Sequence, residues 1–331
     1  MQTTYHAKTA GIGSNNAPTN TDLRISQLST EENKPRWVIA VFAHNEAKTI
    51  QAALKSIVAA TADHDVSVYV LANGCTDATI DKVRSCAASL PNLWLVEIPV
   101  ADKANAWNIF IHDLFTEEEA SDFKTWFFMD GDVTLTSNSM PILASTLDDA
   151  QDAEAAGGMP GSGRDMDAWR QRMVVNGMLA GNYYALRGSF VQQVRKVQIR
   201  MPVGLIGEDF FVSWMVANIA WRDTEPARRA RCVFSGSAEF MFQSLSPLRL
   251  SDYRTYLHRK WRYTLRDLQH QMMIMLLMEE GLTSMPSTVE ELYNRAPLPS
   301  RLNWAGVLQT PLYLLAVLRI RSFRERSGRS K

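Results

Sequence analysis

The sequence predicts an α/β fold: a mostly parallel central sheet flanked by helices, followed by a C-terminal helical extension. Short apolar runs alternate with helical segments from Trp37 to Asp130. The runs are apolar throughout, which is typical of parallel strands that are buried on both faces. Strands that are separated by helix-length segments form βαβ units, and the strands of such units lie parallel in one sheet.

Each element of this first half has its own signal. Ile50, Leu54 and Ile57 recur at the spacing of one helix face, and Thr76 or Asp77 is a candidate N-cap for the next helix. The predicted strands cover residues 37–42, 66–71, 93–98 and 127–129, and the helices between them cover 50–58, 76–90 and 103–115.

After Asp132 the alternation becomes irregular. A glycine-rich segment at 157–163 is predicted to consist of turns. The other predicted elements are a strand at 183–187 and helices at 139–147, 166–179, 210–221 and 248–280.

Composition bounds the class of protein and its compartment. The chain has 35 Lys and Arg against 35 Asp and Glu, so its overall charge gives no reason to expect a nucleic acid partner. Its 3 cysteines lack metal-binding spacing, which is typical of a reducing compartment. The first residues lead into no apolar core, so a cytoplasmic protein is expected rather than a secreted one. Residues 1–34 are rich in Thr, Asn, Ser and Gly and are predicted to form a flexible leader.

The strand at 127–129 runs directly into Asp130-Gly131-Asp132. Open α/β sheets bind ligands at the carboxyl ends of their strands, and two carboxylates there are costly unless a cation lies between them. Mg²⁺ typically takes one or two protein carboxylates together with substrate phosphates. Gly131 would let the backbone turn sharply, so that both carboxylates face one ion. The alternative is a surface turn, because Asp-Gly is also a common turn pair.

Polar residues follow the earlier strands at the same predicted edge. Asn45 and Glu46 follow the first strand and Asn73 and Asp77 the second, where their side chains could bond a ribose or a base. Lys103 stands near a helix start, where it could counter phosphate charge. Each has a plainer alternative, because Asn, Asp and Glu are common in caps and first turns, and a lone lysine is usually solvated.

A second acidic pair, Glu208 and Asp209, follows Gly207 and precedes an aromatic, strongly apolar helix. The free backbone N–H groups at a helix N-terminus favour carboxylates and tend to keep them ionised. An ionised carboxylate in a cleft is what a general base requires, whereas simple helix capping is the alternative explanation.

Taken in order across residues 36–265, these segments resemble the family 2 glycosyltransferases with the GT-A fold. The resemblance rests on five segments: 44–46, 73–77, Lys103 with Asn108, 130–132 and 207–209. It implies an inverting, metal-dependent hexosyl- or N-acetylhexosaminyl-transferase, of the kind used in polysaccharide biosynthesis, which uses a nucleotide diphosphate sugar as donor. Residues 35–245 would then form the catalytic domain.

The resemblance also implies roles for the donor-binding residues. It places Glu46, Asn73 and Asp77 near the base and ribose of the nucleotide, with Asn45 and Lys103 as further donor-binding candidates.

The family's remaining motifs fall on the two acidic pairs. Asp130 and Asp132 match its metal motif and would hold Mn²⁺ or Mg²⁺ beside the donor, with Asp132 as the more direct ligand. The catalytic base of inverting members falls on Asp209, which Glu208 precedes.

Two departures limit what the resemblance implies. Residues 258–263 have the aromatic and basic character of the Gln-x-x-Arg-Trp motif of processive members but lack the glutamine, so transfer of a single sugar is expected. In that segment Arg259, Trp261 and Arg262 are weaker candidates for the acceptor side, within a predicted helical acceptor-side extension at 246–300. Ala72-Asn73 stands where many members have paired aspartates, which leaves the nucleotide base open.

The C-terminal residues 301–331 are predicted to form an amphipathic basic tail. Its uncharged stretch, 302–318, would span about 26 Å as a helix, less than the roughly 30 Å of a hydrocarbon core. The arginines that follow favour a peripheral or half-inserted contact of 302–326 with anionic lipid at the inner face of the membrane. A helix packed on the catalytic domain and a true span are the alternatives. A lipid-linked acceptor would make such a contact useful, and a glycan is the other acceptor class.

The sequence therefore predicts a glycosyltransferase that moves one sugar to a glycan or lipid-linked hydroxyl. One rival is a nucleotidyltransferase, which would want a glycine-rich phosphate loop early in the chain, and residues 40–46 contain none. The other rival is a membrane-attached scaffold that binds nucleotide or glycan without catalysis.

Overall fold

The computed structural model describes residues 4–5, 22–30, 34–163, 165–218, 231–243, 250–299 and 309–329. The chain divides into two compact units, which we describe separately. We call Met1–Gln198 together with Asp209–Ser244 the sheet unit, and Ile199–Glu208 together with Leu245–Lys331 the helical unit. The short segment Ile199–Glu208 thus belongs with the helical unit, although it lies inside the stretch predicted as the catalytic domain.

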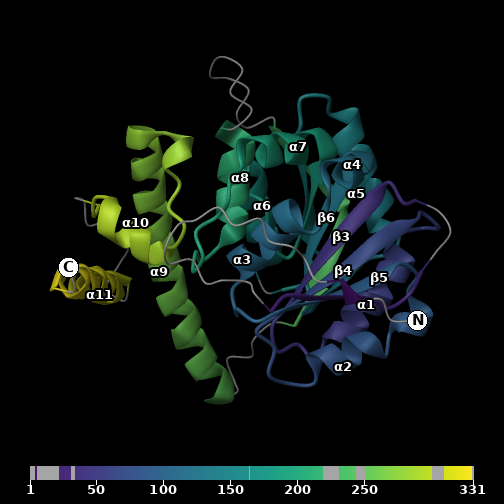
Figure 1. Cartoon of the computed structure of the whole chain (residues 1–331), viewed down its shortest axis with the longest axis horizontal. Coiled ribbons are helices and arrows are strands. Elements are labelled where there is room, and N and C mark those ends of the chain that lie inside the picture. Colours follow the sequence, from purple (N-terminus) through teal and green to yellow (C-terminus); the bar gives the residue numbers. More distant parts are fainter. Residues whose placement is uncertain are drawn as a thin grey trace. The chain divides into compact units, whose positions relative to one another are not determined.

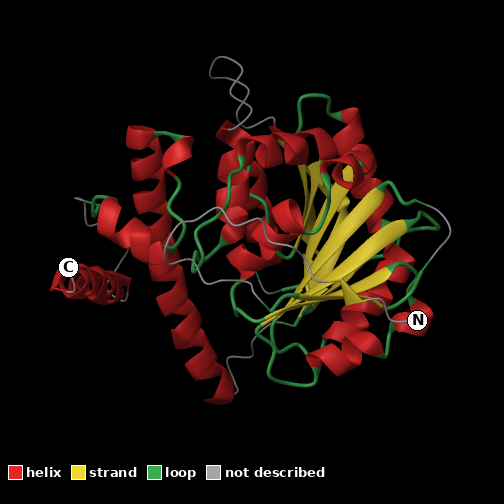
Figure 2. Ribbon diagram, viewed as in Figure 1, coloured by secondary structure: helices red, strands yellow, loops and turns green. Residues whose placement is uncertain are grey.

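The sheet unit is built on a ten-stranded sheet with the order β1-β2-β5-β4-β3-β6-β9-β8-β10-β7 in the described part of the chain. Helices lie on both faces of this sheet (Figure 2). Its strands are β1 (Thr4–Tyr5), β2 (Arg24–Gln27), β3 (Trp37–Ala43), β4 (Val66–Asn73), β5 (Leu93–Ile98), β6 (Thr125–Asp130), β7 (Val133–Leu135), β8 (Ala155–Pro160), β9 (Tyr183–Arg187) and β10 (Cys232–Phe242).

The helices follow the predicted alternation in the first half and fill the connections of the second (Figure 1). They are α1 (Ile50–Ala60), α2 (Thr79–Arg84), α3 (Lys103–Asn108) with a π-helical continuation (Ile109–Asp113), α4 (Glu117–Asp122), α5 (Ser139–Asp149), α6 (Met166–Asn176), α7 (Gly188–Val197) and α8 (Glu208–Asn218). A 3-10 turn, Ala87–Ser89, follows α2, so the helix predicted over 76–90 is shorter and broken. The predicted end of α8, at 219–221, lies outside the described residues.

The sheet is mixed rather than mostly parallel. The strands β5, β4, β3 and β6 run parallel, as predicted, and β8 runs parallel to β10. β9 is antiparallel to both β6 and β8, and the outer strands β2 and β7 also pair antiparallel. The hydrophobic pattern does not reveal the direction of a strand, because the antiparallel β9 is as buried as the strands that run parallel to one another.

The continuous apolar run of β6 is explained by two cores on opposite faces of the sheet. Phe127 and Met129 belong to the core that contains residues of α1 and α5. Trp126 and Phe128 point the other way and pack edge-on against Phe110 of the π-helix, with ring centroids 5.3 and 5.7 Å apart. A strand with both faces covered has no polar face to show in its sequence.

Among the described residues, five strands were not predicted: β1, β2, β7, β8 and β10. Residues 157–160, predicted as turns, lie within β8, where glycine is required by close packing: a Cβ on Gly158 would lie 2.3 Å from Tyr183 Cδ1. Residues 24–27, predicted as part of a flexible leader, form β2 and pair with β5, with Ile25 buried.

The helical unit consists of α9 (Leu250–Glu280), a 3-10 turn (Leu282–Ser284), α10 (Val289–Arg295) and α11 (Gln309–Arg329) in its described residues. Both α10 and α11 pack on α9. The guanidinium of Arg324 on α11 donates to the carbonyls of Tyr293 and Ala296, each at 2.5 Å, which ties α11 to the end of α10. None of the helices in the described ranges is long and apolar enough to cross a membrane. Residues 302–308 of the predicted membrane-contact segment lie outside those ranges.

Candidate functional site

The carboxyl ends of β3, β4 and β6 meet at one edge of the sheet. Phe42 pairs in register with Asp130, and Ala43 pairs with Ala72. The loops that follow these strands therefore start side by side, and they carry most of the residues that the sequence singled out for donor and metal binding.

Asn45 and Asp77 join the first two of these loops. The N–H of Thr76 donates to Asn45 Oδ1 at 2.8 Å, and the N–H of Ala47 donates to Asp77 Oδ2 at 3.1 Å. Asn45 has a φ of 58°, a left-handed conformation that asparagine tolerates better than most residues. These side chains hold the two loops against each other, which shapes the surface that a nucleotide would meet.

Asn73 is buried and its amide is used inside the protein. Its Nδ2 donates to the carbonyls of Ala43 and Leu71, at 3.0 and 3.2 Å. The amide therefore fixes the carboxyl end of β4 to that of β3, and its donor groups already have partners.

Glu46 lies half-buried within a group of acids. Thr49 Oγ1 donates to Glu46 Oε2 at 2.7 Å. Burial raises the pKa of Glu46, and the negative charges of Asp132 and Asp77 raise it further. The three carboxylates are thus close enough to repel one another, which is the arrangement that a cation relieves.

Asp130 and Asp132 have different surroundings. The Asp130 carboxylate forms an ion pair with Lys103, and the Lys103 Nζ also donates to the carbonyl of Gly181 at 3.4 Å and lies over the Phe42 ring. The Asp132 side chain is exposed. Lys103 therefore lies beside the acidic pair, and its charge is shared with one member of that pair.

Gly131 serves a different purpose from the one predicted. Its φ is not positive, so it does not make a turn that only glycine can make. Its N–H donates to Phe42 O at 2.8 Å, and a Cβ would lie 3.0 Å from that oxygen and 3.2 Å from Ile50 Cδ1. Glycine is needed here because the backbone approaches β3 and α1 closely.

Asp209 is tied to the same edge through a segment that sequence reasoning missed. The N–H of Gly181 donates to Asp209 Oδ2 at 3.0 Å, while the carbonyl of Gly181 accepts from Lys103. The neighbouring carbonyl of Asn182 accepts from the backbone N–H of Asp130 at 3.1 Å. Residues 181 and 182 thus connect the candidate base with the acidic pair. The signal in the sequence was a Gly-Asn pair just before a strand, which also fits an ordinary turn.

Glu208 lies on the helical unit rather than with Asp209. It is buried, and its charge acts on His270 of α9. The acceptor-side candidates of α9 are also on the helical unit: Arg259 and Arg262 are exposed, and the guanidinium of Arg319 lies 5.8 Å from the centre of the Trp261 ring.

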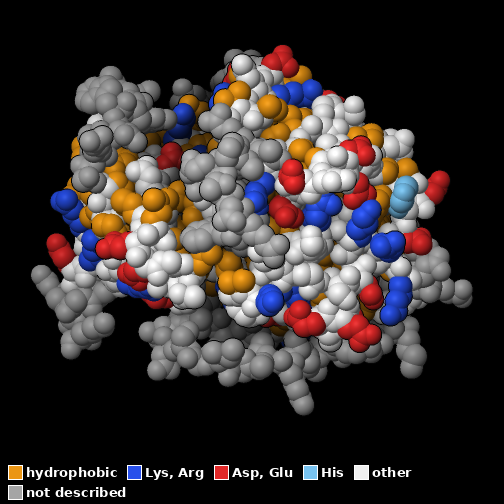
Figure 3. All heavy atoms as spheres, turned by 90° about the horizontal axis from the view of Figure 1, so that it is seen from above, with side chains coloured by type: hydrophobic (Ala, Val, Ile, Leu, Met, Phe, Trp, Pro, Cys, Tyr) orange, Lys and Arg blue, Asp and Glu red, His pale blue; other side chains and the backbone are white. Residues whose placement is uncertain are grey.

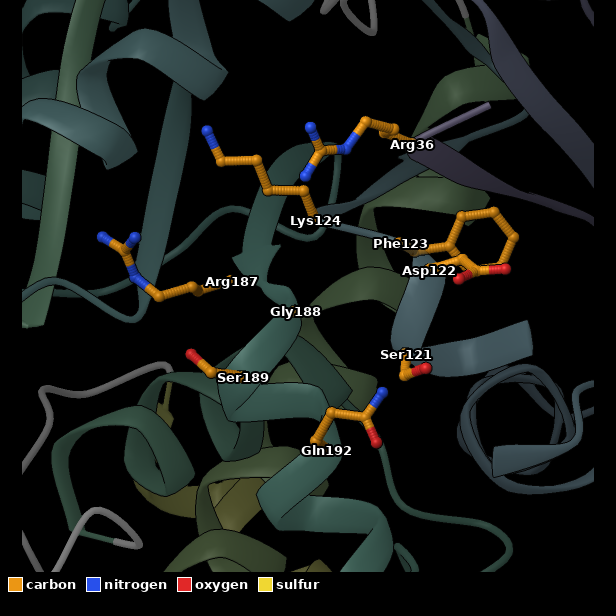
Figure 4. A pocket seen from close by; sticks show the side chains of 9 residues that line it. All are labelled: Arg36, Ser121, Asp122, Phe123, Lys124, Arg187, Gly188, Ser189 and Gln192. Atoms are coloured by element: carbon orange, nitrogen blue, oxygen red, sulfur yellow. The ribbon is translucent and has the colours of Figure 1, made fainter. Parts of the chain in front are cut away.

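The opposite edge of the sheet has a pocket of about 410 Å³ whose charged side chains are mostly basic (Figure 4). It lies where β3 and β6 begin and where β9 meets α7, and Arg36, Lys124 and Arg187 line it. Lys124 is paired with Asp148 at 2.6 Å, and the Arg187 guanidinium donates to the carbonyls of Leu147, Ala150 and Ala153. Two of its three cations are therefore used to hold the fold together.

The acidic edge suits a divalent ion that is shared with a ligand. In the described part of the chain, no three Asp, Glu, His or Cys side chains converge to hold a metal by themselves. Mg²⁺ and similar ions usually take one or two protein carboxylates and complete their shell with phosphate and water. The exposed Asp132, beside Glu46 and Asp130, fits that requirement.

Comparison with known proteins shows what the chain is similar to. Residues 35–187 match the family described as glycosyltransferase-like family 2. A mannosyltransferase from Pyrobaculum calidifontis, solved with GDP-Man and Mn²⁺, has a similar fold, with a TM-score of 0.50 and 15% identity over 92% of this chain and 78% of that one. TarS from S. aureus, solved with UDP-GlcNAc, gives a TM-score of 0.49 and 13% identity over 87% of this chain and 81% of that one. No curated protein sequence matches the chain. Residues 35–187 are therefore similar to family 2 glycosyltransferases, and the chain shares its type of α/β fold with the mannosyltransferase.

Proposed function

We propose that the chain transfers a single sugar from a nucleotide diphosphate sugar to an acceptor hydroxyl, assisted by Mn²⁺ or Mg²⁺ at Asp130 and Asp132. The observation that carries this proposal is the chain of contacts from Asp130 through Lys103 and Gly181 to Asp209. These contacts bring the Lys103 ammonium group, the acidic pair and the candidate base together at the edge of the sheet where the parallel strands end.

The donor side rests on the two joined loops. Asn45, Asn73 and Asp77 act by holding these loops, and Glu46 is the carboxylate best placed to reach a ribose hydroxyl. The similar mannosyltransferase binds GDP-Man with Mn²⁺, which supports a nucleotide sugar and a divalent ion as ligands of this fold.

The leaving diphosphate would lie between Asp132 and Lys103. A divalent ion held by Asp130 and Asp132 would supply positive charge to the leaving diphosphate. Lys103 adds a fixed positive charge on the same side, and its ion pair with Asp130 keeps its ammonium group directed into the site.

Asp209 is the proposed general base, which takes the proton of the acceptor hydroxyl. One N–H donates to each of its oxygens, from Gly181 to Oδ2 and from Phe210 to Oδ1. These bonds fix the plane of the carboxylate and leave a lone pair on each oxygen for the incoming hydroxyl. Glu208 is buried beside His270, so we assign the base to Asp209 alone.

We further propose that the acceptor is a glycan or a lipid-linked sugar and that 302–326 contacts anionic lipid at the inner face of the membrane. On α11, Ala316 and Ile320 are buried, while Leu314, Leu315 and Leu318 remain 47%, 55% and 57% exposed. Arginines 319, 321 and 326 follow these leucines. Figure 3 shows one face on which apolar side chains are interspersed with those of Lys and Arg.

The test is a donor panel with purified protein. GDP-mannose, UDP-glucose and UDP-N-acetylglucosamine are incubated with Mn²⁺, Mg²⁺ or EDTA, and release of GDP or UDP is measured. We expect turnover of at least one donor, its loss in EDTA, and inversion at the anomeric carbon. Asp132→Ala should lose the metal dependence of donor binding, whereas Asp122→Ala, at the opposite edge, should keep it. Incorporation of a nucleotide into product would favour a nucleotidyltransferase, and metal-dependent binding without turnover would favour a scaffold.

Membrane contact has its own test. We expect the protein to float with vesicles that contain phosphatidylglycerol but not with phosphatidylcholine vesicles, and to lose flotation when Leu314, Leu315 and Leu318 are replaced by Ser. Equal flotation with both lipids would contradict the electrostatic part of the proposal.

A further inference from the structure

The turn at 203–207, which precedes Asp209, is held by other residues of the helical unit to which it belongs. Val203 N–H donates to Ser287 O at 3.0 Å, and Val289 N–H donates to Val203 O at 2.9 Å. Gly204 and Gly207 both have positive φ, of 91° and 79°. A Cβ on Gly207 would lie 2.4 Å from Arg266 Cδ, so the turn lies directly against α9.

A single amide at the centre of this clamp binds the turn on one side and α10 on the other. The side chain of Gln269 is only 2% exposed. Its Oε1 accepts from the N–H of Ile206 at 2.9 Å, and its Nε2 donates to Tyr293 Oη at 2.8 Å. The two bonds fix which end of the amide faces the turn, because only the oxygen can accept from a backbone N–H.

The next residue, His270, packs against the same turn. Its Cε1 lies 3.2 Å from the position that a Cβ of Gly207 would take. Burial, together with the positive charge of Arg266, lowers the pKa of His270 to about 4, so the imidazole is uncharged at neutral pH. The ring also hydrogen-bonds to the backbone of Ile206 and Gly207, so His270 and Gln269 hold the turn together, and Gln269 is the one that accepts from the Ile206 N–H.

We infer that Gln269 is a positioning residue for transfer: by holding Ile206, it sets the conformation of the turn that leads into Asp209. The inference rests on the proposed role of Asp209 as the base. Ile206 is separated from Asp209 by only two residues, and one of them is the left-handed Gly207, so a change in the turn is passed along the backbone to Asp209. Reacting groups are sensitive to such changes, since a displacement of 1 Å can lower a rate by roughly 10²-fold.

The test compares Gln269→Met, which keeps the length of the side chain, with Arg295→Met as a matched control. Arg295 joins α10 to α9 through an ion pair with Glu280 at 2.6 Å, so its loss destabilises the same unit without removing a contact to Ile206. For the donor that the protein hydrolyses among GDP-mannose, UDP-glucose and UDP-N-acetylglucosamine, we expect Gln269→Met to lower kcat by about 10- to 100-fold with an unchanged KM. Arg295→Met should stay within about twofold of the unaltered protein.

A double-mutant cycle separates this inference from the proposed function. If Gln269 acts through Asp209, Gln269→Met should cause no further loss in the Asp209→Asn background. An additive loss, an unchanged kcat in Gln269→Met, or an equal loss in Arg295→Met would overturn the inference. Unaltered turnover in Asp209→Asn would instead overturn the assigned base, and the inference with it.

Hydrogen–deuterium exchange gives a readout that needs no turnover. The amides of 203–207 should exchange about tenfold faster in Gln269→Met and at the original rate in Arg295→Met. Tyr293→Phe removes only the hydroxyl that orients the Gln269 amide and should give a smaller change in the same direction. If Gln269→Met does not fold, unchanged exchange and kcat in Tyr293→Phe would overturn the inference.

Discussion

Charged side chains lie at both edges of the central sheet, but they are paired at one edge, and carboxylates repel one another at the other. At the edge where β3 and β6 begin, Lys124 is paired with Asp148 and Arg187 donates to three carbonyls. At the edge where these strands end, Glu46 is surrounded by Asp77 and Asp132, which raise its pKa. Charges with partners inside the fold stabilise the fold. Like charges that gather at one place indicate a ligand of opposite charge.

The largest expected effect comes from removing the proposed base at the edge where the strands end. We expect Asp209→Asn to lower kcat by about 10²- to 10⁴-fold, because the amide cannot take the acceptor proton. It can still accept from Gly181, so donor affinity should stay nearly unchanged, as measured by calorimetry with Mn²⁺ present. A loss of donor affinity as large as the loss of kcat would place Asp209 on the donor side instead.

The difference between the two edges can be tested by replacing one lysine at each edge with methionine. Lys103→Met should weaken donor binding about 10- to 100-fold, because the diphosphate loses a fixed cation and Asp130 loses its partner. Lys124→Met removes an exposed ion pair at the other edge, worth at most about 1 kcal/mol, and should leave donor binding unchanged. Titration of both variants with the same donor measures the difference, and equal losses would remove the distinction between the edges.

Arg187 tests the structural role of the edge where the strands begin. Arg187→Met deletes three bonds to the carbonyls of Leu147, Ala150 and Ala153, so we expect unfolding to become easier by about 3 kcal/mol. Urea denaturation measures this loss. The folded fraction should keep its donor affinity, and a variant of unaltered stability but weaker donor binding would show that the pocket of Figure 4 has a binding role.

The smallest effect concerns the pH dependence of stability at Glu46. Because its pKa is raised in the folded state, the folded protein binds more protons than the unfolded chain as pH rises from 4.5, and stability falls through that window. Glu46→Gln removes the charge and keeps an acceptor for Thr49. In EDTA the variant should therefore have a higher Tm than the original at pH 7 and an equal Tm below pH 4. A lower Tm at pH 7 would contradict the repulsion.

The sequence predicted the parallel half of the fold because each strand there is buried on both faces and each crossover is a helix. It did not predict β8, since the glycines at 157 and 158 that let Phe234 and Tyr183 approach look like turn residues. The sequence also could not show whether neighbouring strands run parallel or antiparallel, because the antiparallel β9 is as buried as a parallel strand would be.

The candidate site divides in a similar way. Side chains at strand ends were found from their position, and Lys103, Asp130 and Asp209 do come together within the sheet unit. The sequence did not predict that Asn45, Asn73 and Asp77 hold the loops together. An amide or carboxylate at the end of a strand gives the same sequence pattern whether it binds a ligand or a backbone group. Gly181 was missed because it contributes only main-chain atoms.

That main-chain contribution bears on how the site tolerates change. Any amino acid except proline has the N–H that reaches Asp209 and the carbonyl that reaches Lys103, and residue 181 does not have the positive φ that would demand glycine. Proline alone lacks the N–H, so of all replacements at residue 181 it is the one that must break the contact with Asp209.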